Sequence, residues 1–165
     1  MRFLSFLLFL FPLWLFAQEA NTYQIRTIAF YNLENLFDTK NDTLIFDDDR
    51  TPTGKDNWTE QRYLQKIEQM SKVISEIGSI DNNTAPDIIG VSEVENLNVL
   101  QDLIHHKNLS TYNYGIVHYD SPDERGIDVA LLYKKSAFVP VNFNSHRLLL
   151  FNLDGKRDYT RDQLI

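Results

Sequence analysis

The stretch at residues 86–96, Pro-Asp-Ile-Ile-Gly-Val-Ser-Glu-Val-Glu-Asn, limits the possible folds of this chain more than any other segment. Its apolar, largely β-branched residues follow a proline over a length typical of strands, which predicts a buried strand. Because side chains alternate across a strand, Glu93 shares a face with Ile89 and Val91, whereas Glu95 is expected in the following turn. A carboxylate at this end of a central strand is costly to bury alone, and ligands bind at this end of open α/β sheets.

Glu93 therefore has two interpretations that position alone does not separate. In the first, its carboxylate holds a metal ion at the carboxyl end of the sheet. In the second, it caps the helix expected to begin at residues 96–100.

A second strand is predicted at residues 23–31. Like the first, it is an apolar segment followed by polar residues, here Asn-Leu-Glu-Asn at 32–35. If the extended geometry continues, Asn32 and Glu34 lie on one side of the chain. Asn32 could then orient a catalytic carboxylate or a phosphate, and Glu34 could be a metal ligand. The alternative is a polar turn in which both side chains bond the local backbone.

A helix is predicted between these two strands. Asn57 resembles an N-cap with Glu60 three residues later, and Gly78 ends the helix. An apolar stripe recurs at helical spacing, at Tyr63, Ile67, Met70, Ile74 and Ile77. A helix that connects two strands in this way favours a parallel pair in one sheet.

The second half of the chain predicts a short helix at residues 97–105 and strands at 114–119 and 127–133, the latter two joined as an antiparallel pair. Asp128 interrupts an apolar strand, and Arg125 is the nearest candidate partner in sequence. The pair is either a structural ion pair or part of the rim of a phosphate site. Further strands are expected at residues 138–143 and 147–153, and residues 160–165 look like the opening of another.

The first residues have the pattern of a secretory signal peptide. Residues 1–17 contain one basic residue, Arg2, before an apolar run that ends in alanine, which predicts export to the periplasm or the extracellular space with cleavage after residue 17 or as late as residue 20. The run is short for a retained membrane anchor, so no stable membrane insertion is expected after cleavage. The remaining residues, 21–165, are expected to form one domain.

Composition excludes some classes of site. Loss of Arg2 takes the net charge from −7 to −8, so nucleic acid would not be bound through bulk electrostatics, and a phosphate-bearing substrate needs a cation or a local basic patch. The chain has no cysteine, which excludes thiolate zinc sites and makes the fold depend on its packed core.

Three segments together resemble the endonuclease/exonuclease/phosphatase superfamily, of the exonuclease III and pancreatic deoxyribonuclease type. They are residues 29–37 (Ala-Phe-Tyr-Asn-Leu-Glu-Asn-Leu-Phe), residues 86–96, and residues 125–133 (Arg-Gly-Ile-Asp-Val-Ala-Leu-Leu-Tyr), in that order. The resemblance covers about residues 26–165. It implies an α/β (α+β) fold, a four-layer sandwich of two packed sheets, of which about the first half is expected to be present.

The resemblance also implies site residues and a function. Glu34 and Glu93 match metal ligands, Asn32 matches the asparagine after the first strand, and Arg161 resembles an arginine near the scissile phosphate. Mg²⁺ is the expected cofactor, with Mn²⁺ or Ca²⁺ as alternatives, and Arg125 and Asp128 would support the phosphate site. The implied protein is a metal-dependent phosphodiesterase, a nuclease whose partner is nucleic acid or another phosphodiester.

Other family motifs are not found in this chain. The family's later Asp-x-Asn pair is matched only by residues 81–83, which come before Glu93, and the chain has no Asp-His. His118 and His146 are the only mid-chain histidines available as a general base. Little activity is therefore expected of this chain alone. A phospholipid or sugar-phosphate esterase of the same fold, and a non-catalytic half-domain or binding module, remain alternatives.

Overall fold

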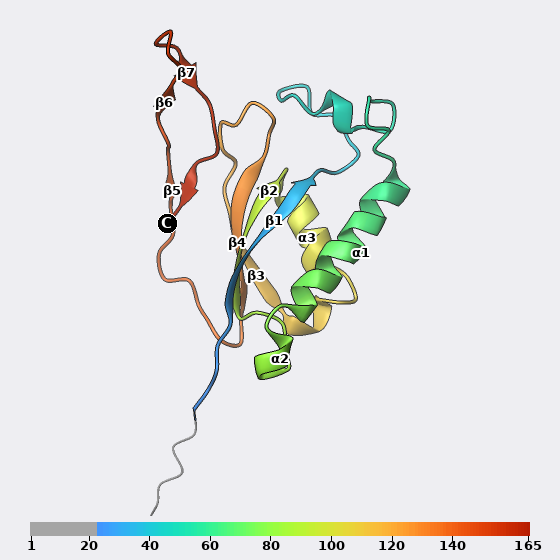
Figure 1. Cartoon of the computed structure of the whole chain (residues 1–165), viewed down its shortest axis with the longest axis vertical. Coiled ribbons are helices and arrows are strands. Elements are labelled where there is room, and N and C mark those ends of the chain that lie inside the picture. The colour runs from blue at the N-terminus through green and yellow to red at the C-terminus, as the bar shows by residue number, and fades with distance from the viewer. Residues whose placement is uncertain (1–22) are drawn as a thin grey trace, which may run out of the picture.

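The computed structural model describes residues 23–165 (Figure 1). The predicted signal peptide, including both possible cleavage positions, lies outside the described residues. Within residues 23–165, no helix is both long enough and apolar enough to cross a bilayer.

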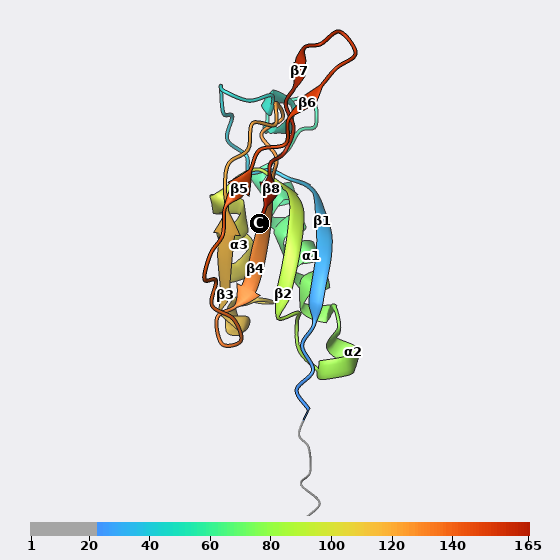
Figure 2. The same cartoon turned by 90° about the vertical axis from the view of Figure 1, so that its left-hand side faces the viewer.

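A four-stranded mixed sheet organises the fold, with strand order β1-β2-β4-β3 (Figure 2). Its strands are β1 (Ile28–Leu36), β2 (Ile88–Val94), β3 (Tyr114–His118) and β4 (Asp128–Lys134). β1 and β2 are parallel, and β4 is antiparallel to both β2 and β3. The predicted parallel pair and the predicted antiparallel hairpin are both confirmed.

β1 differs from the strand predicted at residues 23–31. Residues 23–27 form no strand, whereas the strand continues past Tyr31 to Leu36. The continuation is explained by burial, since Leu33 and Leu36 are fully buried and Leu36 pairs with Val94.

Two helices cover one face of the sheet, as Figure 1 shows: α1 (Glu60–Glu76) and α3 (Leu97–His105). A short helix, α2 (Ser79–Asn82), follows α1, and single 3₁₀ turns lie at Asp48–Arg50 (η3) and Ser110–Tyr112 (η4). Buried residues of the α1 and α3 stripes pack with those of the central strands into a single core, which includes Tyr63, Ile67, Ile74, Leu100, Leu103, Ile89, Val91, Ala130 and Leu132. The predicted stripe of α1 is confirmed, with Met70 and Ile77 at its partly buried margin.

The start of α1 corrects the predicted cap. Asn57 has a positive φ of 49° and does not cap the helix. Thr59 is the N-cap, and its side chain accepts a hydrogen bond from the backbone N–H of Arg62. Glu60 is thus the first residue of the helix, which is compatible with the favourable effect of an acid near a helix N-terminus.

The last part of the chain lies against the opposite side of the sheet from the helices (Figures 1 and 2). It forms two short ladders, β5 (Ser145–His146) with β8 (Gln163–Leu164), and β6 (Leu150–Phe151) with β7 (Arg157–Asp158). β8 contacts β4 and so joins this segment to the main sheet. The strand predicted at residues 138–143 is wrong, and the one predicted at 147–153 is reduced to β6; most of their large apolar residues, including Val139 and Val141, are exposed and supply little burial.

The described residues therefore confirm a mixed α/β fold built on a four-stranded mixed sheet. The expected four-layer sandwich stays a prediction.

Candidate functional site

The carboxyl ends of β1 and β2 lie side by side because the strands are parallel and paired in register. Asn32 is paired with Ser92, the residue immediately before Glu93. Beyond this pair the register shifts, and three residues adopt the left-handed conformation: Glu34 (φ 54°), Asn35 (φ 60°) and Glu93 (φ 60°). Residues other than glycine seldom adopt such angles, and those that do cluster at functional sites. Both candidate acids thus lie where the regular strand geometry breaks.

Asn32 fixes the first of these breaks. Its Oδ1 accepts a hydrogen bond from the backbone N–H of Glu34 at 2.7 Å. This contact matches the Asn32 half of the turn that the sequence left open as an alternative. Among the described residues, the side chain of Glu34 makes no such bond to the backbone. The turn does not exclude a ligand role for Glu34, whose side chain is exposed.

Lys66 of α1 is a charged neighbour that sequence reasoning missed. Its ammonium group donates to the backbone carbonyls of Glu34 and Asn35. Burial lowers the pKa of Lys66, as does the charge of Arg50, whereas the charges of Glu34 and Glu93 raise it. Both carboxylates therefore act on the same ammonium group. The sequence gives no signal of this contact, because it depends on how α1 packs on the sheet.

Arg161 comes from the far end of the chain to the second acid. Its Nη1 lies 3.6 Å from Oε1 of Glu93, with the two side chains 31% and 20% exposed. Arg161 belongs to the segment before β8, in the last part of the chain, which lies on the side of the sheet opposite α1 and α3 (Figure 1). The structure thus brings Glu93 together with Arg161, two residues that the sequence proposed separately.

The alternative role for Glu93, as a helix cap, is wrong. α3 is capped by Asn96, whose Oδ1 accepts from the backbone N–H of Val99 at 3.1 Å. Glu95 follows β2, as expected, yet it is only 7% exposed. The backbone N–H of Asp38 donates to its carboxylate at 2.6 Å. Burial, reinforced by nearby acids, nevertheless raises the pKa of Glu95 to about 8.

The expected pairing of Arg125 with Asp128 is also wrong. Arg125 instead contacts Asp123, with Nε 3.3 Å from Oδ1. Asp128 is bound by His118, whose Nε2 lies 2.9 Å from Oδ2, and its Oδ1 accepts from the backbone N–H of Ser121 at 2.8 Å. The antiparallel register explains why His118, and not Arg125, is the partner of Asp128. His118 pairs with Ala130 and so lies diagonally across from Asp128.

A comparison of the sequence with known protein families assigns the chain to a family. The sequence model of the Endonuclease/Exonuclease/phosphatase family matches residues 27–165, so the chain belongs to this family. The family is generally one of hydrolases that act on phosphoesters, typically with a metal ion. No curated protein and no solved structure matched the chain.

The residues at the ends of β1 and β2 fit the metal that the family implies. Mg²⁺ prefers oxygen ligands and is commonly bound through one or two carboxylates, with water and substrate oxygens completing its octahedron. Glu34 and Glu93 offer two carboxylates at neighbouring strand ends, both close enough to Lys66 to affect its pKa.

Proposed function

We propose that this protein is an exported, Mg²⁺-dependent phosphoesterase that hydrolyses phosphodiester bonds in nucleic acid. The observation that carries the proposal is the parallel pairing of β1 with β2, which puts Asn32 and Glu34 at the strand end next to that of Glu93, together with the contact of Arg161 with Glu93. Family membership supports the reaction class.

Each of these side chains has a separate role in the proposed site. Glu34 and Glu93 would hold Mg²⁺, which supplies Lewis acidity at a phosphoryl oxygen when bound. Asn32 holds the backbone of Glu34 in its turn. Arg161, released from Glu93 by competition with the substrate, would donate to a non-bridging phosphate oxygen, because guanidinium groups match phosphate geometry.

A local cluster of basic residues favours a polyanionic substrate despite the acidic net charge of the chain. Lys66 and Arg62 lie over the ring of Trp58, at 5.6 Å from its centroid in each case. Arg50 lies 5.7 Å from the centroid of Phe37, and its charge acts on Lys66. Of these three cations, Lys66 contacts the backbone of Glu34 directly, and Arg50 is also paired with Asp56 at 3.1 Å. Lys66 would therefore be the first positive partner for phosphates flanking the scissile bond.

The first test measures substrate binding, because hydrolysis by this chain alone is expected to be slow. A fluorescent DNA with uncleavable phosphodiester analogues is titrated with the protein in Mg²⁺ or in EDTA. We expect binding only with Mg²⁺, weakened by on the order of tenfold or more in Glu93→Gln, because removing a ligand weakens the metal that bridges to the phosphate. Glu124→Gln, an exposed acid away from the site, is the matched control. Equal binding in EDTA and in Glu93→Gln would contradict the proposal.

The substrate class and export are tested separately. Sphingomyelin vesicles and a sugar phosphate replace DNA in the same titration, and Mg²⁺-dependent binding to either in place of DNA would assign the alternative substrate. Export is tested by fractionating cells that express the full sequence and determining the N-terminus of the product. A mature protein beginning after residue 17 or 20, outside the cytoplasm, is the expected result.

A further inference from the structure

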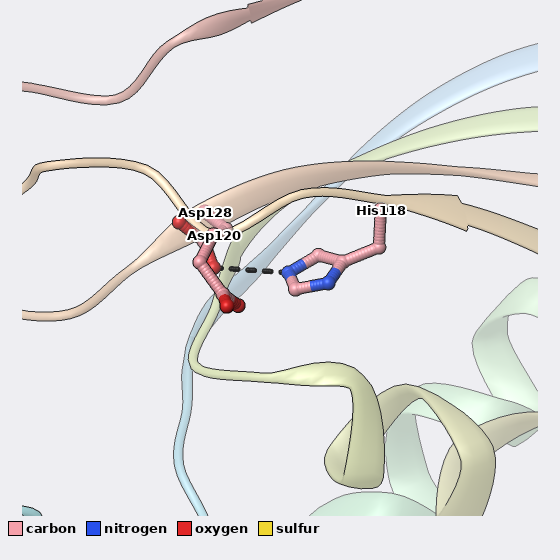
Figure 3. Close-up of side chains that lie close together, drawn as sticks. All are labelled: His118, Asp120 and Asp128. Atoms are coloured by element: carbon pink, nitrogen blue, oxygen red, sulfur yellow. Dashed lines mark hydrogen bonds and ion pairs between the residues drawn. The ribbon is translucent and has the colours of Figure 1, made fainter. Parts of the chain in front are cut away.

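A second cluster of ligating side chains lies where the β3–β4 hairpin meets the loop between the strands. Figure 3 shows His118, Asp120 and Asp128 directed toward one another. One ligand atom from each, an imidazole nitrogen and two carboxylate oxygens, lies within 4.8 Å of the others. The proposed phosphoesterase site uses none of these residues.

Two of the three groups are held in place by the fold. The side chains of His118 and Asp128 are 5% and 4% exposed, and Nε2 and Oδ2 are 2.9 Å apart. Asp128 is held further by the backbone N–H of Ser121, and Ser121 Oγ donates to the carbonyl of Ile127 at 3.2 Å. The loop therefore keeps its shape through its own hydrogen bonds.

Asp120 completes the cluster from the exposed side. Over residues 23–165, its carboxylate makes no hydrogen bond or ion pair with another side chain or backbone group. A cavity of about 450 Å³ is lined by Asp120 and Asp128, together with Asp38, Asp42 and Glu95. The lining also includes Lys40, and burial raises the pKa of Glu95 to about 8, so the negative charge of the opening comes mainly from the four aspartates. A cation can therefore reach the cluster from solvent through an opening of net negative charge.

The distances suit a small transition ion. At metal–ligand distances of about 2.0–2.2 Å, neighbouring ligands on one ion lie roughly 3.0–3.5 Å apart, depending on the coordination angle. Nε2 of His118 and Oδ2 of Asp128 are 2.9 Å apart, so they need to separate only slightly to reach this spacing. Asp120 needs only a side-chain rotation to approach, because it is exposed and has no competing partner among the described residues. Water from the cavity can fill a fourth position.

We propose that His118, Asp120 and Asp128 bind a first-row divalent transition ion, of which Zn²⁺ is the best representative, through ligands other than Glu34 and Glu93. An imidazole nitrogen with two carboxylates favours such an ion over Mg²⁺, which prefers oxygen ligands throughout. The bound ion replaces the His118–Asp128 hydrogen bond with two metal bonds. It thereby fastens the loop of residues 119–127 to the sheet.

The experiment titrates Zn²⁺ into EDTA-treated, dialysed protein by calorimetry. The background carries Glu34→Gln and Glu93→Gln, so that the proposed Mg²⁺ site does not contribute. We expect one saturable site that a tenfold excess of Mg²⁺ over Zn²⁺ does not displace. Loss of one ligand is expected to weaken affinity by on the order of 10- to 100-fold or more, in Asp120→Asn and in His118→Gln.

Two controls keep the result interpretable. His146→Gln removes an exposed histidine of β5 and is expected to leave Zn²⁺ affinity unchanged. Asp120→Asn alters an exposed side chain, so it decides the question if His118→Gln fails to fold, as judged by circular dichroism. Co²⁺ added in place of Zn²⁺ gives visible absorption bands that report nitrogen and oxygen ligation directly. Absence of saturable binding, or binding that Asp120→Asn and His146→Gln affect equally, overturns the proposal.

Discussion

Arg161 and Glu93 join the last segment of the chain to the carboxyl end of β2, with 3.6 Å between Nη1 and Oε1. Both side chains are partly exposed, and ion pairs of this kind contribute about 0–1 kcal/mol to stability. The pair is therefore weak support for the fold. In the proposed function, the same arginine is a phosphate donor that Glu93 holds near the site until substrate arrives.

The first prediction separates these two roles of Arg161. Arg161→Met is expected to weaken Mg²⁺-dependent binding of the uncleavable DNA by roughly 10- to 100-fold, because hydrogen bonds to charged groups are worth about 1.5–3 kcal/mol. Thermal unfolding is expected to change little. Arg147→Met, at an exposed position, is the control. A large loss of stability with unchanged DNA affinity would make Arg161 a structural residue only.

The second prediction concerns the contact from Asn32 to the backbone of Glu34. Asn32→Ala removes the acceptor that holds the backbone of Glu34 in its turn, so the Cα position from which the carboxylate extends is no longer fixed. Mg²⁺ affinity is expected to fall by about 10- to 100-fold, as for residues that orient metal ligands. Calorimetric titration with Mg²⁺ measures the affinity of the wild type and of the variant. Asn32→Asp keeps the acceptor oxygen and is expected to retain the turn. Wild-type Mg²⁺ affinity in Asn32→Ala would show that the turn does not position Glu34.

The parts of the fold that the sequence predicted depend on local patterns. The stripe from Tyr63 to Ile77 has the period of a helix. The run at residues 88–91 was assigned to a strand from its β-branched residues, its short length and the proline before it. The parallel pairing of β1 with β2 followed from the helix between them. Asn32, Glu34 and Glu93 could be placed near one another for the same reason, since parallel strands end at the same edge.

The remaining features depend on long-range contacts. The partner of Asp128 is His118 because of the β3–β4 register, which the nearness of Arg125 in sequence does not reveal. Lys66 reaches Glu34 only through the way α1 packs on the sheet. The left-handed conformation of Glu93 is another example, because residues other than glycine adopt it only where the surrounding structure imposes it.

The third prediction uses that conformation. At φ 60°, a residue with a Cβ is strained by roughly 1–2 kcal/mol, and glycine avoids this strain. Glycine also loses more conformational entropy on folding, which cancels part of that advantage. Glu93→Gly is therefore expected to be more stable than Glu93→Ala by about 1 kcal/mol, although both lose the metal ligand. Urea denaturation gives the difference. At Ser92, which remains paired within the sheet, the order is expected to reverse, with glycine less stable than alanine. The same order at both positions would contradict the assigned strain.

The fourth prediction concerns Asp87, a buried carboxylate that ties the start of β1 to the end of β4. It lies 3.1 Å from Nη1 of Arg26 and 3.6 Å from Nζ of Lys134, and it accepts from the backbone N–H of Thr27 at 3.0 Å. Removing one partner of a buried ion pair leaves the other uncompensated, at a cost of about 3–5 kcal/mol. Asp87→Asn is expected to destabilise the protein by that order, because Lys134 is 7% exposed.

The pH dependence of stability tests the same carboxylate. Burial alone would raise the pKa of Asp87, but the bond from Thr27 and the charges of Arg26 and Lys134 together hold it below its ordinary value of 3.8. Since the folded pKa lies below the unfolded one, this contribution is complete above about pH 4 and is lost as the pH falls through the folded pKa. Denaturation of the wild type between pH 2 and 7 should show that loss, and Asp87→Asn should lack it. Asp158→Asn, a substitution of an exposed residue of β7, is the control and should keep the wild-type dependence of stability on pH. If Asp87→Asn showed the same dependence as the wild type, the acid sensitivity would belong to other carboxylates.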